Sequence, residues 1–172
     1  ENKAAASDIE IDRIAVFNHG KLQQIGNSTE IYDTPANEFV ANFVGTSNLF
    51  AGKVIERNGR LVTVETANGR RLVATSDRFA IGDSVKLVLR PEHLRIAGSG
   101  EATSNHAILG TITDAVFVGS VVRVHVDVGF GRTAIVHHQY DRTGLGAALT
   151  PGTPVTIVYS PEAAHLISAG GA

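Results

Sequence analysis

The chain contains 172 residues and carries 15 Lys and Arg against 17 Asp and Glu, which gives a formal net charge of −2. This length fits one ordinary domain or two small ones, and the lack of a basic excess argues against a general nucleic-acid binder. Because the sequence has no cysteine, disulfide scaffolds, Cys-ligated zinc sites and thiol catalysis are excluded. The longest apolar run has four residues, far fewer than the roughly 18 of a membrane-spanning helix.

The first 45 residues predict a hairpin followed by two short helices. Apolar residues at 14–17 and 22–25 flank the turn signal Asn18-His19-Gly20, which favours a β-hairpin. Ser28 or Thr29 is expected to cap a short helix, and Pro35 fits the first turn of a second helix that ends at Gly45. Residues 1–11 follow no such pattern. Since the chain opens without a methionine, we interpret it as a processed product or a cut piece.

From residue 52 onward the pattern changes to short strands. Asn58-Gly59 and Asn68-Gly69 are dipeptides typical of type I′ hairpin turns, in which both central residues take positive φ. A segment rich in Gly, Ser and Thr at 98–104 has the composition of a linker. The strands expected before it lie at 52–57, 61–66, 70–74, 85–89 and 94–96.

The last third of the chain repeats the middle third. Residues 82–92 match 152–162 at an offset of 70, residues 52–55 match 110–113 at an offset of 58, and Gly69-Arg70 matches Gly131-Arg132 at an offset of 62. The second copy therefore has four extra residues around 117–119 and eight more within 139–151.

About five short strands per copy is the count of a small Greek-key barrel of the OB type. We predict a mainly β fold with two tandem OB-like barrels that pack together, because each copy alone would bury little core. The predicted domains are residues 1–45 for the hairpin and helical link, 46–100 for the first barrel and 101–172 for the second.

A set of histidines is the first candidate for chemistry. Valines alternate with Arg123 and His125, so these polar residues are expected on the solvent face of a strand. His137 and His138 follow on the next strand, and His125 and His137 as cross-strand neighbours could bind a metal ion. No third ligand is visible, so a solvated polar face that contacts a partner is the preferred interpretation and no metal site is predicted.

Two further segments are candidate contact sites. The inserted loop at 116–120 combines Phe117 with Gly119 and Ser120, which could meet a ligand or a protein; the alternative is a hairpin whose Phe117 caps a barrel. Arg90 and Glu92 flank a proline turn and could contact a partner; the alternative is an exposed ion pair of little energy.

Three segments together resemble ATP-binding subunits of ABC importers. Residues 12–26 resemble the end of the nucleotide-binding domain, and residues 29–45, from Thr29-Glu30-Ile31-Tyr32-Asp33 to Phe43-Val44-Gly45, resemble the helical link that follows it. Leu89-Arg90-Pro91-Glu92 and the two barrel copies resemble the transport-associated OB (TOBE) region. The polyamine, ferric-iron and phosphonate importers are the most similar kind. The phosphate loop, signature motif and Walker B carboxylates of the family do not occur in this sequence.

The resemblance implies a regulatory and dimerisation region with no catalytic or cofactor-binding residue of its own. ATP and Mg²⁺ would belong to the parent subunit. The implied partners are a second copy of the chain and, in the parent, membrane permease subunits and a solute-binding protein. The implied location is cytoplasmic, peripheral on the inner face of the cell membrane. In some family members this region also receives an inhibitory ligand or protein.

The sequence leaves two alternative functions to consider. An OB-type module for single-stranded nucleic acid would need stacking aromatics and basic residues on one face. Aromatic residues are only 6% of the chain and the net charge is −2, so no nucleic-acid partner is expected. A small metal-dependent enzyme built on His125 and His137 is the other alternative, and a metal analysis of the purified protein would detect it.

Overall fold

The computed structural model describes residues 13–98, 107–139 and 149–170. The chain divides into two units, Glu1–Gly45 and Thr46–Ala172, and the first ends at the residue where the sequence predicted the helical link to end. Most of the predicted linker at 98–104 and most of the predicted insertion at 139–151 lie outside the described residues, as do residues 1–11.

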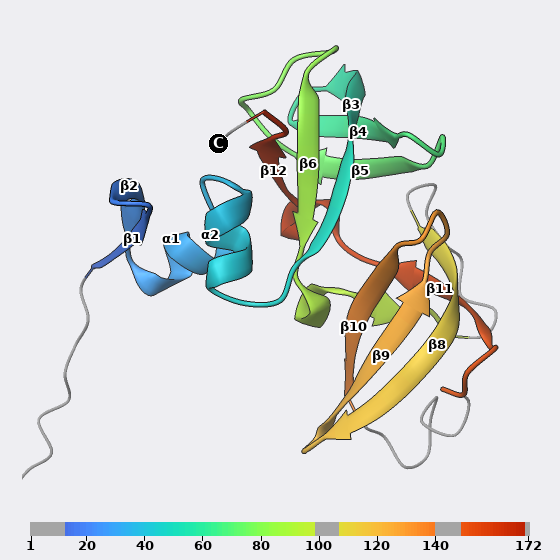
Figure 1. Ribbon diagram of the computed structural model, residues 1–172. Coiled ribbons are helices and arrows are strands. Elements are labelled where there is room, and N and C mark those ends of the chain that lie inside the picture. Colours follow the sequence, from blue (N-terminus) through green and yellow to red (C-terminus); the bar gives the residue numbers. More distant parts are fainter. Residues whose placement is uncertain (1–12, 99–106, 140–148, 171–172) are drawn as a thin grey trace, which may run out of the picture. The chain divides into compact units, whose positions relative to one another are not determined.

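The first unit contains the predicted hairpin and two short helices (Figure 1). Its hairpin strands pair antiparallel, and Val16 packs with Ile31 and Val40 in a small core of its own. The elements are β1 (Ile14–Asn18), β2 (Lys21–Gly26), α1 (Ser28–Asp33) and α2 (Glu38–Phe43).

The helix caps differ from those predicted. Asn27, not Ser28 or Thr29, caps α1: its Oδ1 accepts a hydrogen bond from the Glu30 backbone N at 2.8 Å, and the Glu30 carboxylate accepts one from the Asn27 backbone N at 2.9 Å. This reciprocal capping box satisfies two backbone donors, where Ser28 would satisfy one. Asn37 caps α2 and leaves Pro35 outside the helix.

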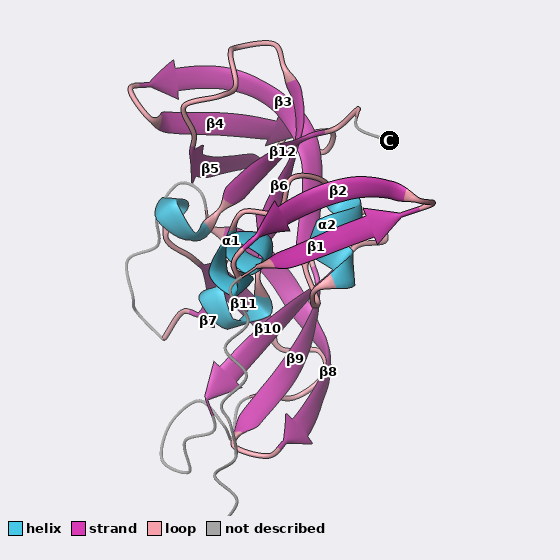
Figure 2. Cartoon of the chain, turned by 90° about the vertical axis from the view of Figure 1, so that its left-hand side faces the viewer, coloured by secondary structure: helices cyan, strands magenta, loops and turns pink. Residues whose placement is uncertain are grey.

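Two five-stranded antiparallel sheets make up the second unit (Figures 1 and 2). One cluster of buried side chains spans both sheets. Their strand orders are β12-β6-β3-β4-β5 and β10-β9-β8-β11-β7. The first copy comprises β3 (Asn48–Asn58), β4 (Leu61–Thr66), β5 (Arg71–Thr75), β6 (Ser84–Leu89), the 3₁₀ helix η1 (Pro91–His93) and β7 (Arg95–Ile96). The second comprises β8 (Ile108–Val118), β9 (Val121–Asp127), β10 (Thr133–Gln139), β11 (Pro154–Val158), the 3₁₀ helix η3 (Pro161–Ala163) and β12 (His165–Ser168).

Matched hydrogen bonds confirm the duplication. The Gly82 backbone N donates to Val54 O at 2.8 Å, and the Gly152 backbone N donates to Ile112 O at 2.8 Å. These residues stand at the predicted offsets of 70 and 58. The mainly β, OB-like fold predicted from the repeat is therefore confirmed.

The last strand of each copy pairs with the sheet of the other copy. β7 pairs with β11 through Ile96 and Ile157, and β12 pairs with β6 through Leu166 and Leu87. The predicted boundary at residue 100 separates the two copies in sequence, but each sheet contains strands from both sides of this boundary. Each copy, which the sequence assigned to one barrel, thus has its last strand, β7 or β12, in the sheet formed by the other copy.

Both Asn-Gly dipeptides lie at turns, but the predicted type I′ form is wrong. At the first turn Asn58 pairs with Leu61, so the two loop residues are Gly59 and Arg60, and of the two only Gly59 has positive φ. At the second, the Gly69 backbone N donates to Thr66 O at 2.9 Å and Gly69 takes the positive φ. In both turns a single glycine supplies the left-handed conformation, so the asparagine before it avoids the steric cost.

Candidate functional site

The alternation predicted along residues 121–128 is present in β9. Val122, Val124 and Val126 are buried, whereas Arg123 and His125 are half-exposed. His125 lies opposite Ile135, and His137 lies opposite Arg123, so the two histidines are diagonal rather than direct neighbours. Within the described ranges no group of three metal-ligating side chains occurs. The face remains a candidate for contact with a partner.

Glu92 and His137, both singled out from the sequence, lie together. Their Oε2 and Nδ1 atoms are 3.8 Å apart, and η1 packs against β10 at this point. Arg90 is different, because it is only 3% exposed and its Nη1 donates to the Ser47 hydroxyl at 2.6 Å and to Thr46 O at 3.4 Å. The sequence-based expectation that Arg90 contacts a partner is therefore wrong. Arg90 follows the end of β6, and its hydrogen bonds connect this point to the segment just before β3.

The segment predicted as an inserted loop is the end of a long hairpin. β8 continues to Val118 and pairs with Val121, so that only Gly119 and Ser120 form the loop. Phe117 is 61% exposed, so the alternative in which it caps a barrel is wrong. Val116 and Val118 are 44% and 50% exposed. We call these residues, Val116 to Ser120, the hairpin tip; Phe117 lies on one face of β8, and Val116 and Val118 lie on the other.

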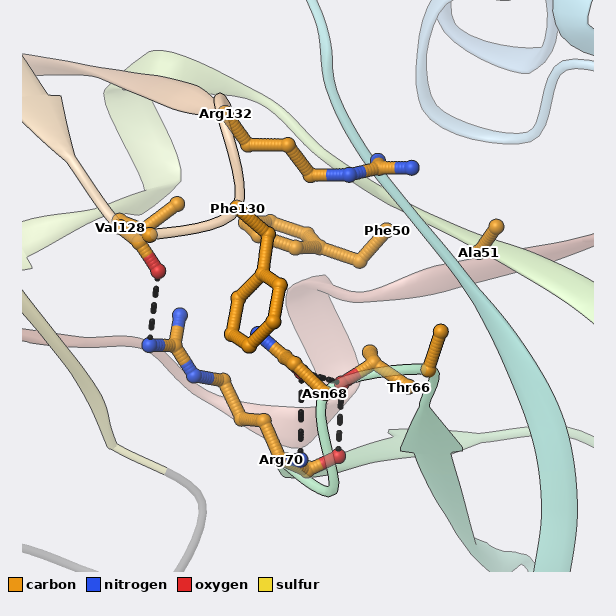
Figure 3. A pocket seen from close by; sticks show the side chains of 10 residues that line it. Phe50, Ala51, Thr66, Asn68, Arg70, Val128, Phe130 and Arg132 are labelled. Atoms are coloured by element: carbon orange, nitrogen blue, oxygen red, sulfur yellow. Dashed lines mark hydrogen bonds between the residues drawn. The ribbon is translucent and has the colours of Figure 1, made fainter.

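A pocket that was not predicted lies between the two sheets, with a volume of about 270 Å³ (Figure 3). Its walls are the turn at 66–70 after β4 and the turn at 128–132 after β9, which are equivalent in the two copies. The lining residues are Phe50, Ala51, Thr66, Ala67, Asn68, Arg70, Val128, Gly129, Phe130 and Arg132. The sequence signal for this pocket is the match of Gly69-Arg70 with Gly131-Arg132, which by itself indicates the repeat and not a pocket.

Two equivalent arginines cross between the copies at this pocket. Arg70 Nη2 donates to Val128 O at 3.0 Å and to Leu109 O at 3.1 Å, and Arg132 Nη1 donates to Leu49 O at 2.9 Å. Each arginine thus binds the first strand of the other copy. Burial of the Arg70 side chain lowers the pKa of its guanidinium from the usual value, because a desolvated charge is disfavoured.

In the described parts of the chain, neither helix has the length and hydropathy needed to cross a bilayer.

A comparison with known families matches residues 87–167 to the TOBE domain model. This range begins in β6 of the first copy and ends in β12 of the second.

Similar proteins extend the match over most of the chain. The Spermidine/putrescine import ATP-binding protein PotA of Rubrobacter xylanophilus is 36% identical over 163 residues, which cover 93% of this chain and 41% of that protein. The protein of the same name from Ruegeria pomeroyi is 34% identical over 156 residues, with coverages of 91% and 41%. The chain thus spans about two fifths of the length of these relatives.

A solved structure supports the fold. ModG, described as a cytoplasmic molybdate-binding protein, superposes with a TM-score of 0.61 over 69% of this chain and 94% of its own, at 18% identity. At this identity the likeness concerns the arrangement of strands alone. The sequence similarity carries the family: the chain contains a TOBE domain and is homologous to the C-terminal region of PotA-type ABC importer ATP-binding subunits.

Proposed function

We propose that this chain is the regulatory and dimerisation region of the ATP-binding subunit of an importer for polyamines or a similar solute. The observation that carries the proposal is the 36% identity to a spermidine/putrescine import ATP-binding protein along 93% of the chain. In such a subunit ATP and Mg²⁺ would bind outside this region. Its partners would be permease subunits and a solute-binding protein, and its place the cytoplasmic face of the membrane.

The chemistry of the sequence supports a region without catalysis of its own. A phosphate loop needs consecutive backbone N–H groups and a lysine around the phosphates, in the pattern Gly-x-x-x-x-Gly-Lys-Ser/Thr. That pattern does not occur among the 172 residues. The outer face of β9 and β10 and the hairpin tip supply surfaces for partners rather than reacting groups.

The proposed dimer contact is the hairpin tip. β9 has β8 on one side and β10 on the other, so its backbone is not open to a second chain. The hairpin tip instead presents three consecutive apolar side chains, each at least 44% exposed. Apolar surface of this kind gains free energy when it is buried, and in a two-fold dimer the same patch is used on both copies.

An exchange of regions tests the regulatory role. In the Rubrobacter relative, the region matched by this chain is replaced by the chain itself, and the subunit is reconstituted with its permease partners. ATP hydrolysis and spermidine import are then compared with those of a subunit that lacks the region. We expect the exchanged subunit to couple hydrolysis to import and the shortened one to lose that coupling. Equal coupling without the region would contradict the proposal.

A further inference from the structure

We propose that the pocket between the two sheets binds a small organic anion that has a flat apolar part. The pocket is bounded by equivalent turns of the two copies, and Figure 3 shows Arg70 on one side of it and Arg132 on the other. The inference rests on the chemistry of this lining and is independent of the proposed function of the chain.

The charge of the lining selects an anion. Its ten residues include two arginines and no acidic side chain. In the described ranges, no carboxylate lies within ion-pair distance of Arg70 or Arg132. A guanidinium has five N–H donors, and Arg132 uses one of its nitrogens, Nη1, on Leu49 O. The remaining donors suit a pair of oxygens of a carboxylate or a phosphate, to which arginine binds in a bidentate manner.

Asn68 adds a directed donor to the same pocket. Its Oδ1 accepts a hydrogen bond from the Arg70 backbone N at 3.3 Å and lies against the Thr66 hydroxyl, so the oxygen is held by the turn. The Nδ2 group has no partner among the described residues, and Figure 3 shows the side chain directed toward the ring of Phe130. The polar side chains of the lining therefore offer donors, which matches a ligand rich in acceptors.

Phe130 selects the apolar part of the ligand. Phe130 is 81% exposed and has a φ of 58°. It lies between Gly129 and Gly131, whose φ angles are 87° and 68°. A phenylalanine in this left-handed conformation costs free energy, and leaving its ring in water gains none of the stabilisation that burial would give. In Figure 3 the ring stands at the pocket between the two arginines, where its face is open for stacking against a planar group.

The duplication makes the pocket asymmetric, which gives the ligand two different ends. Phe130 occupies the position equivalent to Asn68, since Gly131 matches Gly69. One turn therefore contributes a hydrogen-bond donor and the other an aromatic ring, while each contributes an arginine. A polyamine does not fit this lining, because its ammonium groups would meet two guanidinium groups and no carboxylate.

The test is calorimetric titration of the complete chain with two aromatic anions, adenosine monophosphate and phenylacetate. Adenosine, inorganic phosphate and spermidine serve as comparison probes. We expect at least one of the two anions to bind with a Kd below about 1 mM, and the tighter one identifies phosphate or carboxylate as the preferred charged group. Each comparison probe is expected to bind at least about tenfold more weakly, because it lacks one of the two recognised parts.

Three variants locate the binding. R132Q removes one guanidinium, and F130G removes the ring while placing glycine where the backbone favours it, so the fold is preserved. Each is expected to weaken binding about tenfold or more. R60Q is the matched control, since it removes an exposed charge paired with Asp77 outside the pocket. The inference is overturned if neither aromatic anion binds at about 10 mM, if phosphate alone binds as well, or if either pocket variant keeps the affinity of the original chain.

Discussion

The hydroxyl of Tyr159 bonds both backbone polar groups of Val73, the central residue of the outer strand β5. It accepts a hydrogen bond from the Val73 backbone N at 3.0 Å and donates one to Val73 O at 3.1 Å. The equivalent strand of the second sheet, β10, is closed in the same way. Asn48 Oδ1 accepts from the Ile135 backbone N at 2.7 Å, and its Nδ2 donates to Ile135 O at 2.9 Å.

Each of these side chains comes from the other copy. Tyr159 follows β11 and closes an edge of the first sheet, while Asn48 begins β3 and closes an edge of the second. A sheet edge with unpaired N–H and C=O groups is a template for pairing with another chain. The two buried side chains therefore join the copies and block part of each edge.

The first prediction concerns Y159F. Removing the hydroxyl leaves the Val73 N–H and C=O without their partner, and we expect the free energy of unfolding to fall by about 1–3 kcal/mol. Denaturant unfolding measures the loss, and amide exchange measures faster exchange at Val73. Unchanged protection of that amide, together with unchanged stability, would show that water replaces the hydroxyl without cost.

The same tyrosine predicts a loss of stability at alkaline pH. Burial raises the pKa of Tyr159 to about 12 from 10.0, and the hydrogen bond to the Val73 backbone opposes this only in part. The folded pKa lies above the unfolded one, so the contribution to stability is complete below pH 10 and is lost as the pH rises to about 12. A shift of this size corresponds to about 2–3 kcal/mol. Unfolding curves of the original chain and Y159F should converge over this range, and parallel pH profiles would contradict the prediction.

Substitution of Asn48 tests the second edge. Asn48 is 5% exposed and also donates to Leu89 O at 3.3 Å, so N48A leaves three backbone groups without their side-chain partner. We expect a loss of about 2–4 kcal/mol in denaturant unfolding, because buried polar groups then lack hydrogen bonds. The matched control is N42A on the exposed side of α2, which should change stability by less than about 0.5 kcal/mol. Similar losses of unfolding free energy in N48A and N42A would refute the stabilising role of the Asn48 hydrogen bonds.

Two glycines permit the close approach of neighbouring strands. A Cβ added at Gly52 would lie 2.5 Å from Glu65 O, and one added at Gly110 would lie 2.6 Å from Asp127 O. Because these contacts involve backbone atoms that cannot rotate away, G52A and G110A should each lose about 1–3 kcal/mol of stability. G170A, where no atom lies within 4 Å of an added Cβ, is the control and should be neutral. Thermal unfolding compares the three.

The repeat and the type of fold could be predicted because they depend on local patterns. Offsets of 58, 62 and 70 located the equivalent strands, and alternating valines located the buried face of β9. The exchange of β7 and β12 could not be predicted in this way. A strand of two or four residues has the same apolar pattern whether it pairs with its own copy or with the other one, so its partner depends on how the two copies pack.

At the candidate site, too, the contacts between residues far apart in the sequence could not be predicted from local patterns. The pairing of Glu92 with His137 joins two predicted residues, but Arg90 is buried although its sequence looks like an exposed turn. The pocket depends on two turns, 66–70 and 128–132, that lie 62 residues apart and face each other only after folding. The match of Gly69-Arg70 with Gly131-Arg132 marks the two turns as equivalent but does not indicate that they face each other.

The last prediction concerns assembly through the hairpin tip. If a second copy covers Phe117, burying two such rings removes apolar surface from water on both chains, since the contact is two-fold. We expect sedimentation of the original chain over a range of concentrations to show a dimer, and F117S to weaken it about tenfold or more. F43S is the matched control, because Phe43 is 66% exposed but lies in α2, outside the hairpin tip. A chain that stays monomeric at high concentration would contradict the dimer itself. A dimer weakened equally by F43S and F117S would place the contact elsewhere.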